Sequence, residues 1–165
     1  MIELPVVPLS AEAFAPFGQV IEAGPAAERR IINGGNTERF HDLARLDPGP
    51  EGRAIVSIFR GQPRALPFVM SMMEHHPLGS QAFMPLSGRP YLVAVAMPGE
   101  TVRAEDIRVF LASARQGVNY AAGTWHHPLL ALDGVSDFLV IDRAGGGDNC
   151  VEQALDEPAR ITLQT

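Results

Sequence analysis

Histidine is the residue type in this chain whose placement points most directly to chemistry. The chain has five histidines, and four of them fall in two copies of the word His-His-Pro-Leu, at residues 75–78 and 126–129. Imidazole is the commonest metal ligand in proteins and the side chain that titrates closest to neutral pH. Two such words, far apart in the sequence, predict one site built on opposite walls of a cavity.

The same words predict which imidazoles share that cavity. Neighbouring side chains of a strand point to opposite faces, so one histidine of each pair faces inward. We expect His76 and His126 to line the cavity, with Glu74 on the face of His76. His75 and His127 are expected to face the outer sheet surface or a partner subunit. The proline after each pair lacks an amide donor, which suits a strand end or bulge.

The elements that must position these side chains are short apolar runs bounded by glycine and proline. Many such runs and very little helix predict an all-β fold, a sandwich or barrel with one or two short helices, in one domain over residues 1–165. Ser10 is a good N-cap for a helix at 11–17, and a second helix is expected at 104–112, although 109–111 fit a strand equally well. Strands are expected at residues 2–9, 19–22, 30–32, 39–41, 54–60, 66–73, 81–84, 91–96, 138–143 and 160–163, with a hairpin turn at 33–36.

The composition narrows the class of partner. The chain has 165 residues and a formal net charge of −6, with no basic stripe to neutralise nucleic-acid phosphates. No apolar run approaches the roughly 20 residues needed to span a bilayer, and the first residues do not resemble a signal peptide. The single cysteine, Cys150, fits a reducing cytoplasm and is interpreted as a spare thiol. We therefore expect a cytoplasmic protein whose partner is a small molecule, not a nucleic acid or a membrane.

The spacing around the first histidine word resembles a known metal site. Glu74, His76 and Gln81 are spaced like the first motif of the cupin superfamily, with Glu74 in place of its first histidine and Gln81 in place of its acid. His126 follows Gly123 by three positions, as in the second cupin motif. The resemblance implies a jelly-roll β-barrel in which Glu74, His76, Gln81 and His126 surround one divalent metal ion.

The donor set leaves the metal question open. Two nitrogens, one carboxylate and the weak amide ligand of Gln81 suit a labile nickel, manganese or zinc ion better than a tightly held structural one. The alternative is a metal-independent barrel whose polar interior holds only substrate.

A narrower resemblance covers almost the whole chain. Its most specific words are residues 76–83, 116–120 and 125–129, supported by 137–143, and they are similar to those of the ureidoglycolate lyase family. This resemblance implies a cytoplasmic, homodimeric, cupin-like enzyme with which nickel is associated. The implied reaction is that of a carbon–nitrogen lyase, which cleaves (S)-ureidoglycolate to glyoxylate and urea in allantoin degradation.

The implied substrate assigns expected roles. Its cleavage needs a base for the hydroxyl proton and an acid for the departing nitrogen, and histidine serves both near neutral pH. An arginine holds a carboxylate through two hydrogen bonds. We expect catalytic roles for His76, His126 and Gln81. Substrate contacts are expected from Arg60, Asn119, Tyr120, Arg143 and Trp125 (whose ring fits the core or the pocket wall), with Arg39 as a further candidate for the carboxylate.

Two other functions remain open at this level. A cupin isomerase or dioxygenase would need the full set of cupin metal ligands. Glu74 and Gln81 depart from that set, which argues against this function. The other alternative is a non-catalytic cupin that binds a small carboxylate ligand, for example as a small-molecule sensor. Nothing like a DNA-binding appendage is present in the sequence, which argues against a sensor.

Overall fold

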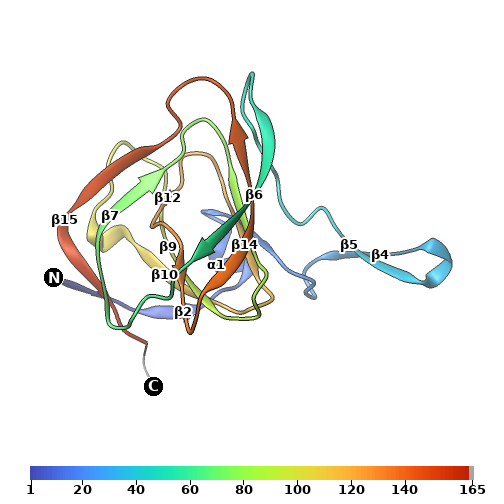
Figure 1. Ribbon diagram of the computed structural model, residues 1–165, viewed down its shortest axis with the longest axis horizontal. Coiled ribbons are helices and arrows are strands. Elements are labelled where there is room, and N and C mark those ends of the chain that lie inside the picture. Colours follow the sequence, from blue (N-terminus) through green and yellow to red (C-terminus); the bar gives the residue numbers. More distant parts are fainter. Residues whose placement is uncertain (164–165) are drawn as a thin grey trace.

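Two β-sheets that curve around a common interior form the body of the protein (Figure 1), shown here as a computed structural model that describes residues 1–163. The larger sheet has the strand order β1-β15-β7-β12-β9-β10-β2, with β13 also paired to β9, and the smaller has the order β3-β11-β8-β14-β6. In chain order the elements are β1 (Ile2–Leu4), β2 (Val6–Pro8), α1 (Ala11–Phe14), β3 (Gly18–Ile21), β4 (Glu28–Ile32), η1 (Asn33–Gly35), β5 (Thr37–His41), β6 (Arg53–Gly61), β7 (Phe68–His75), β8 (Gln81–Pro85), β9 (Tyr91–Ala96), η2 (Ala104–Asp106), β10 (Arg108–Ala112), β11 (Gly117–Tyr120), β12 (Trp125–His126), β13 (Leu130–Ala131), β14 (Ser136–Ala144) and β15 (Val151–Ile161).

The continuous apolar sequence of β9 is explained by cores on both faces of the larger sheet. All six of its residues are buried, because a strand covered on both faces needs no polar alternation. One core lies between the two sheets and contains Tyr91, Val93 and Val95, while the core on the opposite face contains Leu92, Ala94 and Ala96. The pocket described below opens on the side of the first core.

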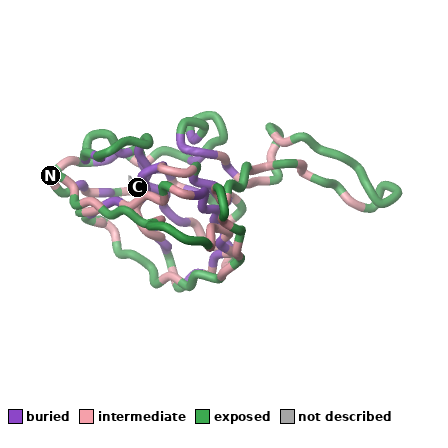
Figure 2. The backbone as a smooth tube through the Cα atoms, turned by 90° about the horizontal axis from the view of Figure 1, so that it is seen from above, coloured by how far each residue is buried: buried purple, intermediate pink, exposed green. Residues whose placement is uncertain are grey.

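A two-stranded arm, β4 with β5, projects from this body (Figures 1 and 2). Its strands pair with each other, from Glu28 opposite His41 to Ile32 opposite Thr37, and with no other strand of the described chain. Figure 2 shows the arm in the colours of exposed and intermediate residues: all of β4 is exposed, and β5 is partly intermediate.

The structure confirms the all-β prediction and most predicted strands. The predicted helix N-cap is present, since the Ser10 hydroxyl accepts a hydrogen bond from the Ala13 amide at 3.2 Å. The closing strand is longer than predicted and begins at Val151. Within residues 1–163, no helix is both long and apolar enough to cross a bilayer.

The predicted helix at 104–112 is wrong, and the alternative prediction of a strand at 109–111 is confirmed. Only the 3₁₀ turn η2 is helical there, and β10 follows it as a strand between β9 and β2. Val109 faces one core and Phe110 the other. Pairing with two neighbouring strands therefore overrides the weak local helix preference.

Candidate active site

A pocket of about 370 Å³ opens between the two sheets. Its floor and walls combine apolar residues, such as Phe59, Phe83 and Leu129, with several polar ones. A few polar groups on an apolar wall are typical of a small-molecule site. The polar side chains that line it are Arg60, Arg64, Glu74, Gln81, Tyr91, Tyr120, His126 and His127.

Glu74, His76 and His126 come together beside this pocket, as their spacing predicts. Strand β12 lies between β7 and β9, and this pairing places His126 directly opposite Glu74. The Oε1 atom of Glu74 lies 3.4 Å from Nε2 of His126 and 4.0 Å from Nε2 of His76. The two imidazole rings are 5.0 Å apart between centroids.

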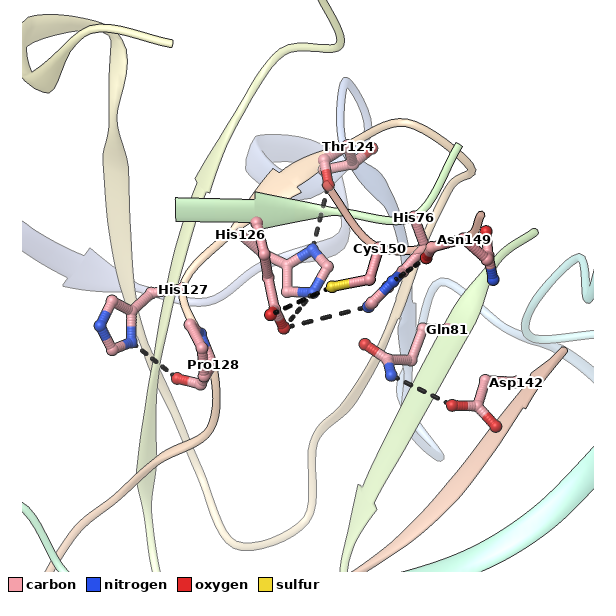
Figure 3. A network of polar contacts seen from close by, with 10 residues as sticks. His76, Gln81, Thr124, His126, His127, Pro128, Asp142, Asn149 and Cys150 are labelled. Atoms are coloured by element: carbon pink, nitrogen blue, oxygen red, sulfur yellow. Dashed lines mark hydrogen bonds and ion pairs between the residues drawn. The ribbon is translucent and has the colours of Figure 1, made fainter. Parts of the chain in front are cut away.

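Backbone carbonyls fix the orientation of both rings (Figure 3). Nδ1 of His76 lies 2.6 Å from the Asn149 carbonyl oxygen, and Nδ1 of His126 lies 3.0 Å from that of Thr124. A carbonyl only accepts, so each Nδ1 donates a proton and each neutral ring keeps a lone pair on Nε2. Both Nε2 atoms are buried, and neither has a hydrogen-bond partner in the described chain.

This arrangement fits a cation. Two Nε2 lone pairs and a carboxylate lie within 4.8 Å of one another, and acceptors that face each other need a proton or a metal ion between them. Two imidazoles and one carboxylate are a common donor set for divalent transition metals. Glu74, His76 and His126 are therefore candidate metal ligands.

The Glu74 carboxyl is held in its ionised form. Burial raises its pKa, but a proton on the facing Nε2 of His126 or His76, together with the Cys150 thiol, lowers it by more, so the pKa lies below its ordinary value. The cysteine Sγ lies 3.8 Å from the second carboxylate oxygen, Oε2. The sequence interpretation of Cys150 as a spare thiol did not anticipate this contact, because only the return of β15 alongside β7 brings the two residues together.

Gln81 presents an acceptor to the pocket. Its Nε2 donates to Oδ2 of Asp142 at 3.2 Å, and its buried Oε1 has no partner among the described residues. Figure 3 shows the amide of Gln81 between Asp142 and the imidazole of His76.

Tyr120 also reaches the site, whereas its neighbour Asn119 does not. The phenol ring of Tyr120 stacks on His126, with centroids 4.4 Å apart and planes 9° apart. Burial, and then the charge of Glu74, raise the pKa of Tyr120, so the phenol stays neutral and can donate. Asn119 points to the other face of β11, where it donates to Gln19 and to the Arg45 carbonyl, so the structure does not bring this predicted substrate-contacting residue to the pocket.

Trp125 and Arg143 also lie outside the pocket. Alternation along β12 buries the indole of Trp125 in the core opposite His126, where Nε1 donates to the Gly99 carbonyl. The Arg143 guanidinium donates to the carbonyls of Pro48, Pro50 and Gly146. It therefore fastens two loops and does not line the pocket.

The two arginines that line the pocket, Arg60 and Arg64, differ in whether a carboxylate of the described chain pairs with them. Arg60 lines the pocket, but Asp137 holds it through two hydrogen bonds of 2.7 and 2.9 Å. Arg64, which sequence reasoning missed, lines the pocket with its guanidinium carbon 5.6 Å from the Phe68 ring centre. No carboxylate within residues 1–163 pairs with it. The remaining candidate, Arg39, is exposed on the arm.

The histidines predicted to face away from the cavity, His75 and His127, behave differently from each other. His75 packs against Trp125, with ring centroids 4.2 Å apart, away from the pocket, as alternation predicts. His127 is a correction, because it borders the pocket. Strand β12 ends at His126, so alternation does not extend to the next residue. The His127 ring lies against Phe68, apart from the rings of His76 and His126 (Figure 3), and burial lowers its pKa.

Comparison with known proteins gives a consistent result. A family model described as "Ureidoglycolate lyase" matches residues 1–162. The chain is 56% identical over 163 residues to "Ureidoglycolate lyase" of Burkholderia mallei (strain NCTC 10229), covering 98% of this chain and 95% of the relative. It is 57% identical over 155 residues to "Ureidoglycolate lyase 1" of Rhizobium meliloti (strain 1021), covering 93% and 90%. It is 52% identical over 161 residues to "Ureidoglycolate lyase" of Azotobacter vinelandii (strain DJ / ATCC BAA-1303), covering 97% and 96%.

Proposed function

The chain belongs to the ureidoglycolate lyase family, and from this premise we propose that its pocket cleaves (S)-ureidoglycolate to glyoxylate and urea. The observation that carries the assignment of the site is the convergence of two Nε2 lone pairs on the Glu74 carboxylate at the pocket wall. As a lyase, the enzyme breaks the bond between the carbinol carbon and the urea nitrogen.

The proton steps follow from the two oxygens of Glu74. Oε1 faces His76 and His126, while Oε2 accepts the weak hydrogen bond of the Cys150 thiol. The ionised carboxylate takes the substrate hydroxyl proton on Oε2 as the carbon–oxygen double bond forms and the carbon–nitrogen bond breaks. It then returns that proton to the departing nitrogen, so that glyoxylate and intact urea leave.

The remaining polar side chains orient the substrate. Arg64 at the pocket mouth holds the carboxylate. Tyr120 and Gln81 face the urea group with one donor and one acceptor. A divalent ion held by Glu74, His76 and His126 would lower the pKa of the substrate hydroxyl, and nickel is our proposed ion.

Product analysis tests the reaction. Purified protein incubated with (S)-ureidoglycolate is expected to release glyoxylate and urea in equal amounts, above a control without enzyme. Glu74→Gln, which keeps the shape but removes the base, is expected to lower turnover by about 10²–10⁴-fold. Ammonium released at the rate of glyoxylate, with no urease present, would instead indicate hydrolysis of the urea group.

Metal content tests the ion. Protein stripped with a chelator is expected to lose turnover and to regain it best with nickel, compared with manganese and zinc. His126→Ala is expected to bind less of each ion, because one of three ligands is gone. Full turnover by protein that holds no metal would refute the ion proposal and leave the elimination chemistry of Glu74 in place.

We further propose that two copies associate through the β4–β5 arm. An isolated two-stranded hairpin is marginally stable in water, yet this arm exposes 56% of Ile31 and 37% of Ile32. Its mixed charges, such as Arg29 and Glu38, can face those of a second copy across a two-fold axis. A groove of about 400 Å³ at the base of the arm, lined by small residues including Ala15 and Ala27, is a receiving surface.

Light scattering after size exclusion tests the dimer. The wild type is expected at twice the mass of the chain, and Ile31→Asp at the mass of one chain. Val56→Asp is the matched control, because Val56 is 67% exposed on β6, outside the arm. A monomeric Val56→Asp beside a dimeric Ile31→Asp would move the interface to β6.

We also infer a cytoplasmic location, which the exposed free thiol of Cys150 supports.

A further inference from the structure

We propose that Asp142 is the positioning residue that makes the pocket specific for a terminal amino group on the substrate, by fixing which end of the Gln81 amide faces inward. This inference rests on the proposed function for the identity of the substrate. It concerns a residue that does not line the pocket itself.

The sheet places the two residues side by side. Strand β8 pairs with β14 so that Ala82 lies opposite Ile141, and the same register continued by one residue sets Gln81 opposite Asp142. On its other side Gln81 pairs with Tyr120 of β11. Tyr120, Gln81 and Asp142 therefore form one row across three strands, on the face that carries the pocket.

Hydrogen-bonding chemistry then decides the orientation of the amide. A carboxylate only accepts, so Gln81 must turn its Nε2 toward Asp142, to which it donates at 3.2 Å. The amide is planar and its oxygen and nitrogen diverge from the same carbon, so Oε1 points away from Asp142. Gln81 is only 6% exposed, and its Oε1 is buried without a partner in the described part of the chain. The orientation thus leaves an unsatisfied acceptor at the pocket wall.

An unsatisfied buried acceptor favours binding of a ligand that can donate a hydrogen bond to it. The urea group of ureidoglycolate ends in an amino group, which can satisfy Oε1. A ligand that ends in a methyl group leaves the acceptor unpaired, and one that ends in a carboxylate brings two acceptors together. Without Asp142, the amide could rotate and present either end, and this selection would be lost.

Two unreactive ligands isolate this contact. N-carbamoylglycine is ureidoglycolate without its hydroxyl group, so it cannot be cleaved, and N-acetylglycine replaces its terminal amino group by methyl. The wild type is expected to bind N-carbamoylglycine about ten-fold more tightly, the worth of one hydrogen bond in a buried site. Calorimetric titration measures both dissociation constants and does not depend on turnover.

Substitutions at Asp142 test the positioning role. In Asp142→Asn the ratio of the two dissociation constants is expected to fall to about one, through weaker binding of N-carbamoylglycine alone. Asp142→Ser serves the same purpose if the first variant does not fold. Asp106→Asn, an exposed aspartate in η2, is the control and is expected to keep the wild-type ratio.

A double-mutant cycle separates positioning from general structural support. Gln81→Met is expected to lower the ratio as Asp142→Asn does, and the double variant is expected to be no worse than either single one. With ureidoglycolate, Asp142→Asn is expected to raise KM and leave kcat nearly unchanged. A folded Asp142 variant that keeps the ten-fold ratio, or that weakens both ligands equally, would overturn the proposal. Failure of the wild type to release urea would refute the proposed function alone, since the binding ratio is measured separately.

Discussion

At the scale of single residues, the site depends on how each imidazole is held. Backbone carbonyls take the Nδ1 protons of His76 and His126, which leaves both Nε2 atoms facing Glu74. These backbone contacts fix the tautomer of each ring and so decide which ring nitrogen is available to a proton or a metal ion.

The two histidines of the second word are expected to differ on substitution. His126→Ala is expected to lower kcat by about 10²–10⁴-fold, because it removes a neighbour of Glu74 and a candidate metal ligand. His127→Ala removes a ring that packs on Phe68 and is expected to lower the melting temperature while keeping most of the turnover. Kinetics and thermal unfolding of both variants check this. Loss of turnover in a stable His127→Ala, with His126→Ala nearly neutral, would mean that the roles are reversed.

The free guanidinium at the pocket mouth leads to a second residue-scale prediction. Arg64→Gln is expected to raise KM by about 10–100-fold, the range for loss of a charged hydrogen bond, with a smaller change in kcat. Arg60→Gln is the matched variant and is expected to have the smaller effect, because Asp137 already occupies that guanidinium. Steady-state kinetics of both variants decide which arginine holds the carboxylate, and a larger effect at Arg60 would reassign it.

At the scale of elements, short strands set the limits of the alternation rule. It holds along β7, where it separates His75 from Glu74, and along β11, where it separates Asn119 from Tyr120. It ends with β12, which has two residues. His127 therefore borders the pocket that the rule directs it away from.

Close approach of β3 to β11 gives an element-scale prediction. Gly18 has φ +150°, and an added Cβ would lie 1.8 Å from the Asn119 carbonyl oxygen. Gly18→Ala is therefore expected to lower the free energy of unfolding by more than about 1 kcal/mol. Gly146→Ala, where an added Cβ meets no atom within 4 Å, is expected to stay within about 0.5 kcal/mol of wild type. Urea unfolding compares the two, and equal stabilities would contradict the close approach.

At the scale of the whole molecule, the core between the sheets encloses both tyrosines of the chain. Burial raises the pKa of Tyr91 and of Tyr120 above the ordinary value of 10.0. The unfolded chain therefore releases phenol protons near pH 10 that the folded chain retains. Stability from this source is complete below pH 10 and falls as the pH rises further, since the unfolded state then binds fewer protons.

Absorbance at 295 nm measures this effect directly. After a rapid jump to pH 11, the folded protein is expected to show no phenolate signal, whereas the protein in urea is expected to titrate near pH 10. A phenolate signal that precedes unfolding would mean that one tyrosine is open to solvent.

The sequence by itself determined the all-β class, most strands and the meeting of Glu74, His76 and His126. These features depend on local rules, because strand alternation and motif spacing act over a few residues. The expectation of one domain over residues 1–165 stays a prediction.

Tertiary structure decided the rest, for reasons that lie outside any local window. Asn119, Trp125 and Arg143 are polar or aromatic residues beside motif words, yet pairing with distant strands or loops turns them away from the pocket. Cys150 reaches Glu74 only because β15 returns alongside β7, and the loop that carries Arg64 is held at the pocket by a backbone hydrogen bond from Arg64 to the distant Ala131. Which end of the Gln81 amide faces the pocket is decided by Asp142, 61 positions away, and no sequence pattern encodes that hydrogen bond.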